Sequence, residues 1–228
     1  MTLQAIRLIA SVGIAISLLS VTSGTVGAAA DQVGQVTEET MLAAQRYLQE
    51  GRALFDHGAY DRAASAYAKG ITIFERSGEP ELSDLTDGTV QRYLDLLSGY
   101  VVSLDQAASL LCLEGFERRD RALFEEAEPY VRTELDFLKK LSTHADLDQE
   151  LVEILNRVAP QTHEGESFLD HYLASAYFNL GLIARVRGDV ASAEEIVDEL
   201  HTLGRSDVAE ALPTVSGQEL LARWRELL

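Results

Sequence analysis

The chain has 228 residues, of which 46% are hydrophobic, and this suits one domain or one short repeat array with a sizeable core. Its formal net charge of −18 disfavours binding to nucleic acid or to anionic lipid, because both would repel it. The single cysteine, Cys112, excludes an intramolecular disulfide; between two leucines we expect a buried thiol, with an intermolecular bridge as the alternative.

The N-terminal segment 1–30 has the three parts of a secretory signal peptide. One basic residue, Arg7, precedes an apolar run, and small residues follow up to Ala30. The run is shorter than the roughly 20 residues that a membrane span needs. We therefore expect an exported protein, periplasmic or extracellular, with a single domain at 31–228. The alternative is an uncleaved segment that anchors the protein in the inner membrane, which is the only membrane contact expected.

Beyond this segment, apolar residues recur at the i, i+3, i+4 spacing of helices, and almost no segment alternates with a period of two. The pattern predicts an all-α domain of eight to ten helices. The clearest of them cover 37–55, 60–75, 89–104 with a continuation to 114, 120–141, 147–158, 167–186, 189–203 and 216–228. Pro129 falls inside one helix and predicts a kink there, or a helix that begins near Glu128. Ser167 and Ser216 are each followed three positions later by an acidic residue, which is typical of an N-cap.

Two segments near the ends of this domain share one residue pattern. The first has Tyr47, Gly51, Gly58, Tyr60, Ala63, Tyr67 and Gly70, and the second has Tyr177, Gly181, Gly188, Val190, Ala193, Val197 and Leu200. In each segment the first glycine lets the partner helix pack closely, and the second can take the left-handed backbone conformation of a turn. A single hairpin of this kind cannot bury its whole apolar face, so the pattern predicts hairpins that stack.

The shared pattern resembles the tetratricopeptide repeat, a helix–turn–helix unit of about 34 residues. The repeats that the resemblance implies lie near 44–77, 108–141 and 174–204. The middle one is degenerate, because Ala122 replaces the turn glycine and Pro129 interrupts the second helix. The implied fold is a TPR-like α-solenoid of stacked antiparallel hairpins, a right-handed superhelix, with 216–228 as a C-terminal capping helix.

In this family the first helix of each repeat lines a concave face that binds a protein or peptide. Carried over by position, the resemblance implies a partner-binding surface formed by Gln45, Leu48, Arg52, Phe55, Ser175, Phe178, Leu182 and Arg185. The lysine and asparagine pattern with which some members grip a C-terminal carboxylate is missing, so binding of a chaperone tail is not implied. The alternative is that Leu48, Phe178 and Leu182 simply pack against neighbouring helices.

Motifs for chemistry are weak in this sequence. His163 and Glu164 begin like a zinc-protease motif, but the second histidine would have to stand at Ser167. Adjacent carboxylates such as Glu125 and Glu126 point apart on a helix and are typical of a solvated face. We therefore expect no catalytic residues, no metal and no cofactor.

The resulting expectation is a non-catalytic scaffold or adaptor of the cell envelope that binds a protein or peptide partner, and no nucleic acid. Two alternatives remain open. The protein could be a subunit of a larger envelope assembly that docks through the helix at 216–228. It could also be a helical small-molecule binder or enzyme with a site in the irregular middle, 78–166.

Overall fold

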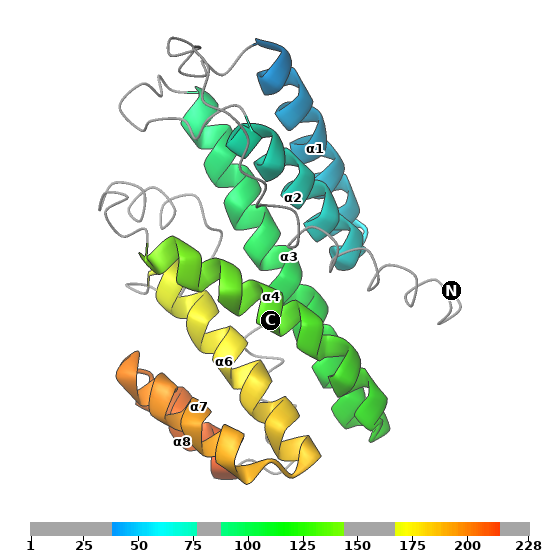
Figure 1. Cartoon of the computed structure of the whole chain (residues 1–228). Coiled ribbons are helices and arrows are strands. Elements are labelled where there is room, and N and C mark those ends of the chain that lie inside the picture. Colours follow the sequence, from blue (N-terminus) through cyan, green and yellow to red (C-terminus); the bar gives the residue numbers. More distant parts are fainter. Residues whose placement is uncertain (1–37, 77–87, 144–166, 215–228) are drawn as a thin grey trace, which may run out of the picture. The chain divides into compact units, whose positions relative to one another are not determined.

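Seven helices make up almost all of the computed structural model, which describes residues 38–76, 88–143 and 167–214 (Figure 1). They are α1 (Glu38–Asp56), α2 (Tyr60–Arg76), α3 (Gly88–Arg118), α4 (Arg121–Thr143), α6 (Phe168–Arg187), α7 (Val190–Thr202) and α8 (Ser206–Thr214). The described ranges contain no strand, so the prediction of an all-α chain is confirmed for them. The segments 1–30, 147–158 and 216–228, for which a signal peptide and two helices are predicted, lie outside the described residues.

Three helices differ from the sequence-based expectations. α3 is one continuous helix of 31 residues. α4 begins at Arg121 rather than near Glu128 and accommodates Pro129, and the Thr133 hydroxyl donates to the Pro129 carbonyl oxygen at 2.7 Å. α8 was not predicted at all, since nine residues give too little periodicity to stand out. The N-cap at Ser167 is confirmed, because its hydroxyl accepts from the Asp170 N–H at 3.0 Å.

Four turns between consecutive helices share one backbone geometry. In each turn one residue has a positive φ: Gly58 (70°), Arg119 (54°), Gly188 (78°) and Gly204 (76°). The next residue donates its N–H to the carbonyl oxygen five positions earlier: Ala59 to Leu54, Asp120 to Gly115, Asp189 to Ala184 and Arg205 to Leu200, each at 2.9 Å. This is the Schellman arrangement that ends a helix. The middle turn therefore lies at Arg119 and not at Ala122, where the repeat pattern placed it.

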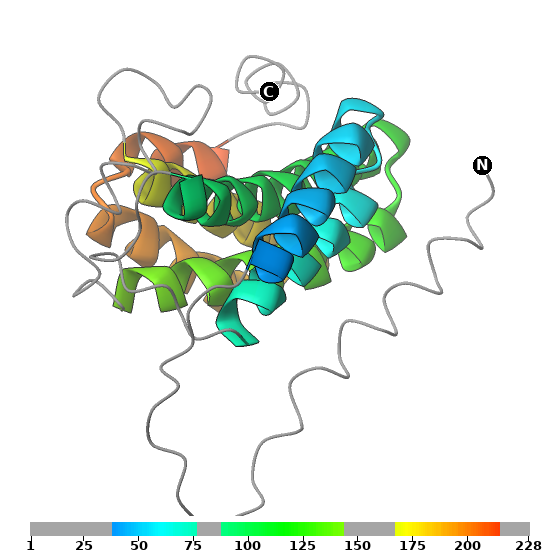
Figure 2. The same ribbon diagram turned by 90° about the horizontal axis from the view of Figure 1, so that it is seen from above.

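The helices pack in a regular order. Each helix contacts the next one in the described chain, and α1 also contacts α3, α3 contacts α6, and α6 contacts α8. Four side-chain hydrogen bonds join α1 to α3 and α3 to α6: Arg92 Nε to Gln45 Oε1 (2.6 Å), Arg52 Nη2 to Asp95 Oδ2 (2.7 Å), Ser175 Oγ to Asp105 Oδ1 (2.5 Å) and Asn179 Nδ2 to Ser109 Oγ (3.1 Å). The partners' numbers rise together, so α1, α3 and α6 run in the same direction (Figures 1 and 2).

Glycines allow the helices to approach closely, as the pattern predicted. A Cβ on Gly51 of α1 would lie 2.6 Å from the ring of Tyr67 on α2, and one on Gly115 of α3 would lie 2.6 Å from Phe124 on α4. A Cβ on Gly181 of α6 would lie 2.7 Å from the side chain of Leu212 on α8. A larger residue at these positions would push the helices apart.

One hydrophobic core runs through all seven described helices. Cys112 on α3 is fully buried in it, which confirms the prediction for this thiol. Burial raises the pKa of the Cys112 thiol, so it is an unreactive group in the folded chain. Within the described residues, the stretch Gln91–Arg118 of α3 is long and apolar enough to cross a membrane, but the core helix of a soluble protein meets the same test.

Candidate functional site

The apolar residues predicted to bind a partner are largely taken up by packing. Leu48 and Leu182 are 2% and 1% exposed, so both belong to the core. Phe178 is half-buried and packs against the core as well. Phe55 is half-buried, and its ring meets that of Tyr60 edge-on at a centroid distance of 4.9 Å. Of these four, only the two phenylalanines reach solvent.

The polar members of the predicted surface divide into two groups. Gln45, Arg52 and Ser175 each form a hydrogen bond with α3 and so join neighbouring helices. Arg185, in the last turn of α6, is exposed and lines a pocket. The structure therefore gives Gln45, Arg52 and Ser175 a role in joining helices, with Arg52 at the surface, and it places Arg185 beside the pocket.

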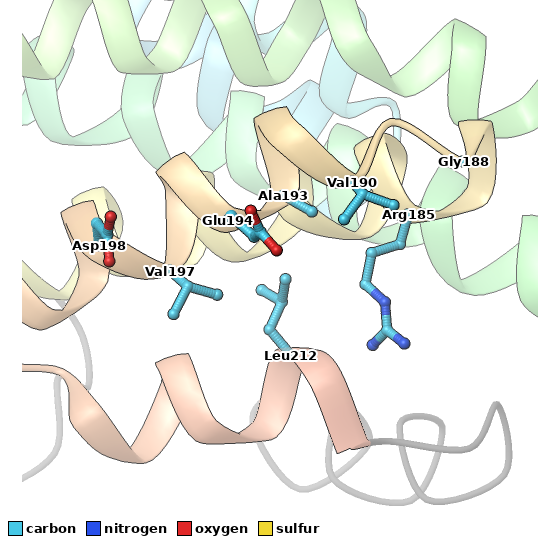
Figure 3. A pocket seen from close by; sticks show the side chains of 8 residues that line it. All are labelled: Arg185, Gly188, Val190, Ala193, Glu194, Val197, Asp198 and Leu212. Carbon is cyan, nitrogen blue, oxygen red and sulfur yellow. The ribbon is translucent and has the colours of Figure 1, made fainter.

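The pocket beside Arg185 has a volume of about 610 Å³ and lies where α6, α7 and α8 meet (Figure 3). We call it the α7–α8 groove; its lining is Arg185, Gly188, Val190, Ala193, Glu194, Val197, Asp198 and Leu212. The sequence pattern indicated Arg185 as a binding residue but not the groove, because α8 was not predicted. The spacing of Val190, Ala193 and Val197 on one helix face was the signal that could have indicated it.

Local structure explains why these side chains converge. Residues three and four positions apart share a helix face, which brings Val190, Ala193 and Val197 together on α7. The α6–α7 turn at Gly188 places Arg185 beside the start of that face. The floor is completed by Leu212 of α8, which points up toward α7 (Figure 3) and packs against Gly181.

Charge is distributed unevenly along the α7–α8 groove. The Arg185 guanidinium lies at one end and the Asp198 carboxylate at the other, with Glu194 between them (Figure 3). Val190 at the rim is 66% exposed, which is unusual for a valine and leaves apolar surface uncovered. Among its described lining residues there is no nucleophile and no imidazole. Chemically, the groove can hold an apolar side chain between a cation and two carboxylates.

A second polar cluster, which the sequence analysis also missed, is buried where α3, α4 and α6 meet. Glu134 of α4 is 0% exposed, and neither of its carboxylate oxygens has a hydrogen-bond partner in the part of the chain that the structure describes. Asp105 of α3 is buried nearby and raises the pKa of Glu134 further than burial alone does. The signal in the sequence was the position of Glu134, which shares a helix face with the apolar residues Val131 and Leu138.

This cluster falls within 78–166, the span for which a small-molecule site is the alternative function. No group of three or more histidine, cysteine or acidic side chains among the described residues is arranged to hold a metal ion. His163 and Glu164 lie outside the described residues. Comparison with the models of protein families, with curated protein sequences and with solved structures gives no match for this chain.

Proposed function

We propose that the chain is an exported, non-catalytic scaffold whose hairpins form a tetratricopeptide-like, right-handed α-solenoid and bind a segment of a partner protein. Three features support this fold: the contacts between α1 and α3 and between α3 and α6, their common direction, and the four turns of one geometry. In such a stack each hairpin buries its apolar face on the next. Its proposed place is the periplasm or cell surface, reached through the signal peptide.

The observation that carries the binding role is the α7–α8 groove with its exposed Val190. Pockets of this size accommodate small apolar groups and use a few polar side chains for orientation. We infer that the partner inserts an apolar side chain above Ala193 and Leu212. A basic group of the partner would face Glu194 or Asp198, and an acidic group would face Arg185.

Complementary charge would act mainly on the rate and specificity of association. The net charge of −18 favours a basic partner segment. Full burial of an exposed valine contributes roughly 1.5–2 kcal/mol, so Val190 is the strongest apolar anchor that the groove offers. Arg185 would add orientation at the rim.

The test is recovery of a partner from envelope extracts by wild-type protein and by the double variant Val190→Glu plus Arg185→Glu. Both positions are exposed, so the fold should tolerate the changes. We expect recovery to fall by about tenfold or more, the equivalent of about 1.4 kcal/mol. The matched control is Leu42→Glu plus Arg62→Glu, which alters an exposed leucine and an exposed arginine on α1 and α2. Equal recovery by the two double variants would contradict a role for the groove.

The position of α8 favours one second candidate, a subunit that docks through 216–228. This segment follows α8 directly, and Leu212 near the end of α8 lines the groove. Truncation before Ser216 separates the possibilities. Loss of folding supports a capping role for the segment, whereas a folded protein that no longer joins its assembly supports docking.

A further inference from the structure

The junction of α3, α4 and α6 contains an acidic group with no counterpart. The three helices contact one another pairwise. At their meeting point Ser175 of α6 donates to Asp105 of α3 at 2.5 Å, and one turn on Asn179 donates to Ser109 at 3.1 Å. Glu134 of α4 is fully buried at the same junction, and both of its oxygens lack a hydrogen-bond partner among the described residues.

A buried carboxyl group without a partner is far more stable as the neutral acid than as the anion. Burial raises the pKa of Glu134 well above its usual value, and the neighbouring Asp105 raises it further. Burial also raises the pKa of Asp105, although the hydrogen bond from Ser175 works against this. The charge of Asp105 therefore opposes the ionisation of Glu134.

The titratable groups that face the junction come from all three helices. Among the described residues, those that interact electrostatically at the junction are Asp105 and Cys112 on α3, Glu134 on α4, and His171 and Tyr172 on α6. Tyr100 on α3 packs against Phe137 on α4. Lys139 lies over the ring of Tyr177, 5.3 Å from its centroid, and His171 acts on Asp105. Among the residues that the structure describes, no cationic side chain contributes to the pKa of Glu134. Loss of its proton would add a second negative charge beside Asp105 instead of completing an ion pair.

We propose that this junction is a proton-dependent latch: it is closed while Glu134 is protonated, and it loosens when Glu134 releases its proton to water. An ionised Glu134 must be hydrated, and hydration requires that α6 move away from α3 and α4. The moving part carries the α6–α7 hairpin and therefore the α7–α8 groove. The inference does not depend on which partner, if any, the groove binds.

The direction of the pH dependence follows from the folded and open states. In the open state Glu134 titrates near its usual pKa of about 4.3, and in the closed state it keeps its proton to a higher pH. At a pH between these two pKa values, the closed state binds one proton more than the open state. The equilibrium constant for opening should therefore rise up to about tenfold per pH unit as the pH increases from about 4.3.

Cys112 provides a built-in probe of the opening. It is the only cysteine of the chain, it is buried, and it lies one turn beyond Ser109 on α3. The rate at which a small disulfide reagent labels it can be measured from pH 5 to pH 8 in wild-type protein and in Glu134→Gln. Dividing the wild-type rate by the Glu134→Gln rate removes the effect of the titration of the thiol itself. We expect this ratio to rise by up to about tenfold per pH unit, because the variant has no proton to lose.

Further measurements keep the test decisive. Labelling of Glu134→Leu should follow the same pH profile as that of Glu134→Gln, and Asp136→Asn, which alters an exposed carboxyl on the same helix, should follow wild type. Hydrogen exchange of the wild-type protein, corrected for intrinsic rates, should show α6 losing protection with rising pH before α2 does. Parallel labelling profiles for wild type and Glu134→Gln, or simultaneous loss of protection in α2 and α6, would overturn the proposal.

Discussion

The ring of Tyr67 on α2 packs directly against Gly99 on α3, where a Cβ would lie 2.6 Å from the ring. The same ring contacts Gly51 of α1, so one aromatic side chain fills the space between three helices. The sequence pattern predicted close helix packing at Gly51, without identifying Tyr67 as the contact, and gave no sign of the contact with Gly99. The Tyr67–Gly99 contact joins the first hairpin to the long helix α3.

The first prediction is that Gly99→Ala destabilises the protein. The added methyl group would overlap a rigid, buried ring, and overpacking of this kind lowers the free energy of unfolding by about 1–3 kcal/mol. Helix propensity alone would act in the opposite direction, since alanine favours helices. Urea unfolding followed by circular dichroism measures the change. Gln49→Ala, at an exposed position of α1, serves as the control and should change stability by no more than about 0.5 kcal/mol.

The second prediction concerns the hydroxyl of Tyr67 at alkaline pH. Burial raises the pKa of Tyr67 to about 12, with the charge of Arg52 acting in the opposite direction. The folded state thus holds this proton above pH 10, where the unfolded state releases it, so stability should fall as the pH rises from about 10 toward 12. Tyr67→Phe keeps the ring and removes the proton. Unfolding curves between pH 9 and 11 should decline more steeply for wild type than for Tyr67→Phe, and equal slopes would count against this assignment.

The third prediction concerns Glu128 on α4, for which stability should fall as the pH decreases. Arg187 at the end of α6 and Arg132 on α4 both donate to its carboxylate, and these hydrogen bonds lower the pKa of Glu128. The stabilisation is therefore present above the usual glutamate pKa and is lost as the pH falls through the lowered value. Glu128→Gln should reduce stability by about 1 kcal/mol at pH 7 and by much less at pH 3.

The control for Glu128 is Glu114→Gln. Glu114 pairs with Arg118 one turn further along α3, at an exposed site. Exposed pairs of this type contribute roughly 0.3–0.5 kcal/mol. Chemical denaturation of both variants at the two pH values makes the comparison. If Glu128→Gln and Glu114→Gln change the stability equally at both pH values, the Glu128–Arg187 ion pair does not stabilise the packing of α4 against α6.

The fourth prediction tests how α8 is held. Leu212 is 1% exposed and contacts Gly181 of α6. Leu212→Ala should destabilise the protein by about 2–4 kcal/mol if the domain unfolds as one unit. Hydrogen exchange should then accelerate first in α8. Val190→Ala, which alters an exposed side chain of the same groove, should change stability by less than about 0.5 kcal/mol.

Sequence patterns located the first and last hairpins well because each has a turn glycine and a complete apolar face. They failed at Arg119, since arginine seldom adopts a positive φ and nothing in the sequence marks it as a turn residue. The burial of Glu134 could not be predicted either. Whether a glutamate on an apolar helix face reaches water depends on a third helix, α6, and a single-helix pattern carries no information about it.

The candidate site was predictable only in part. Its position within the repeat indicated that Arg185 reaches the surface. The repeat pattern did not indicate that Ser175 of α6 donates a hydrogen bond to Asp105 of α3. The groove itself depends on α8, which is too short to leave a clear periodic signal. Three of the residues that the repeat pattern assigned to binding, Gln45, Arg52 and Ser175, thus join adjacent hairpins.

The order of helix contacts has a consequence for how the chain acquires its structure. In the described ranges the main helix contacts join consecutive helices and the pairs α1 and α3, α3 and α6, and α6 and α8, and none of these joins the first hairpin to the last. Such local connectivity means a low contact order, which is associated with fast folding. Each hairpin can therefore pack on the one before it in the order in which the chain is synthesised, without waiting for helices further along the sequence.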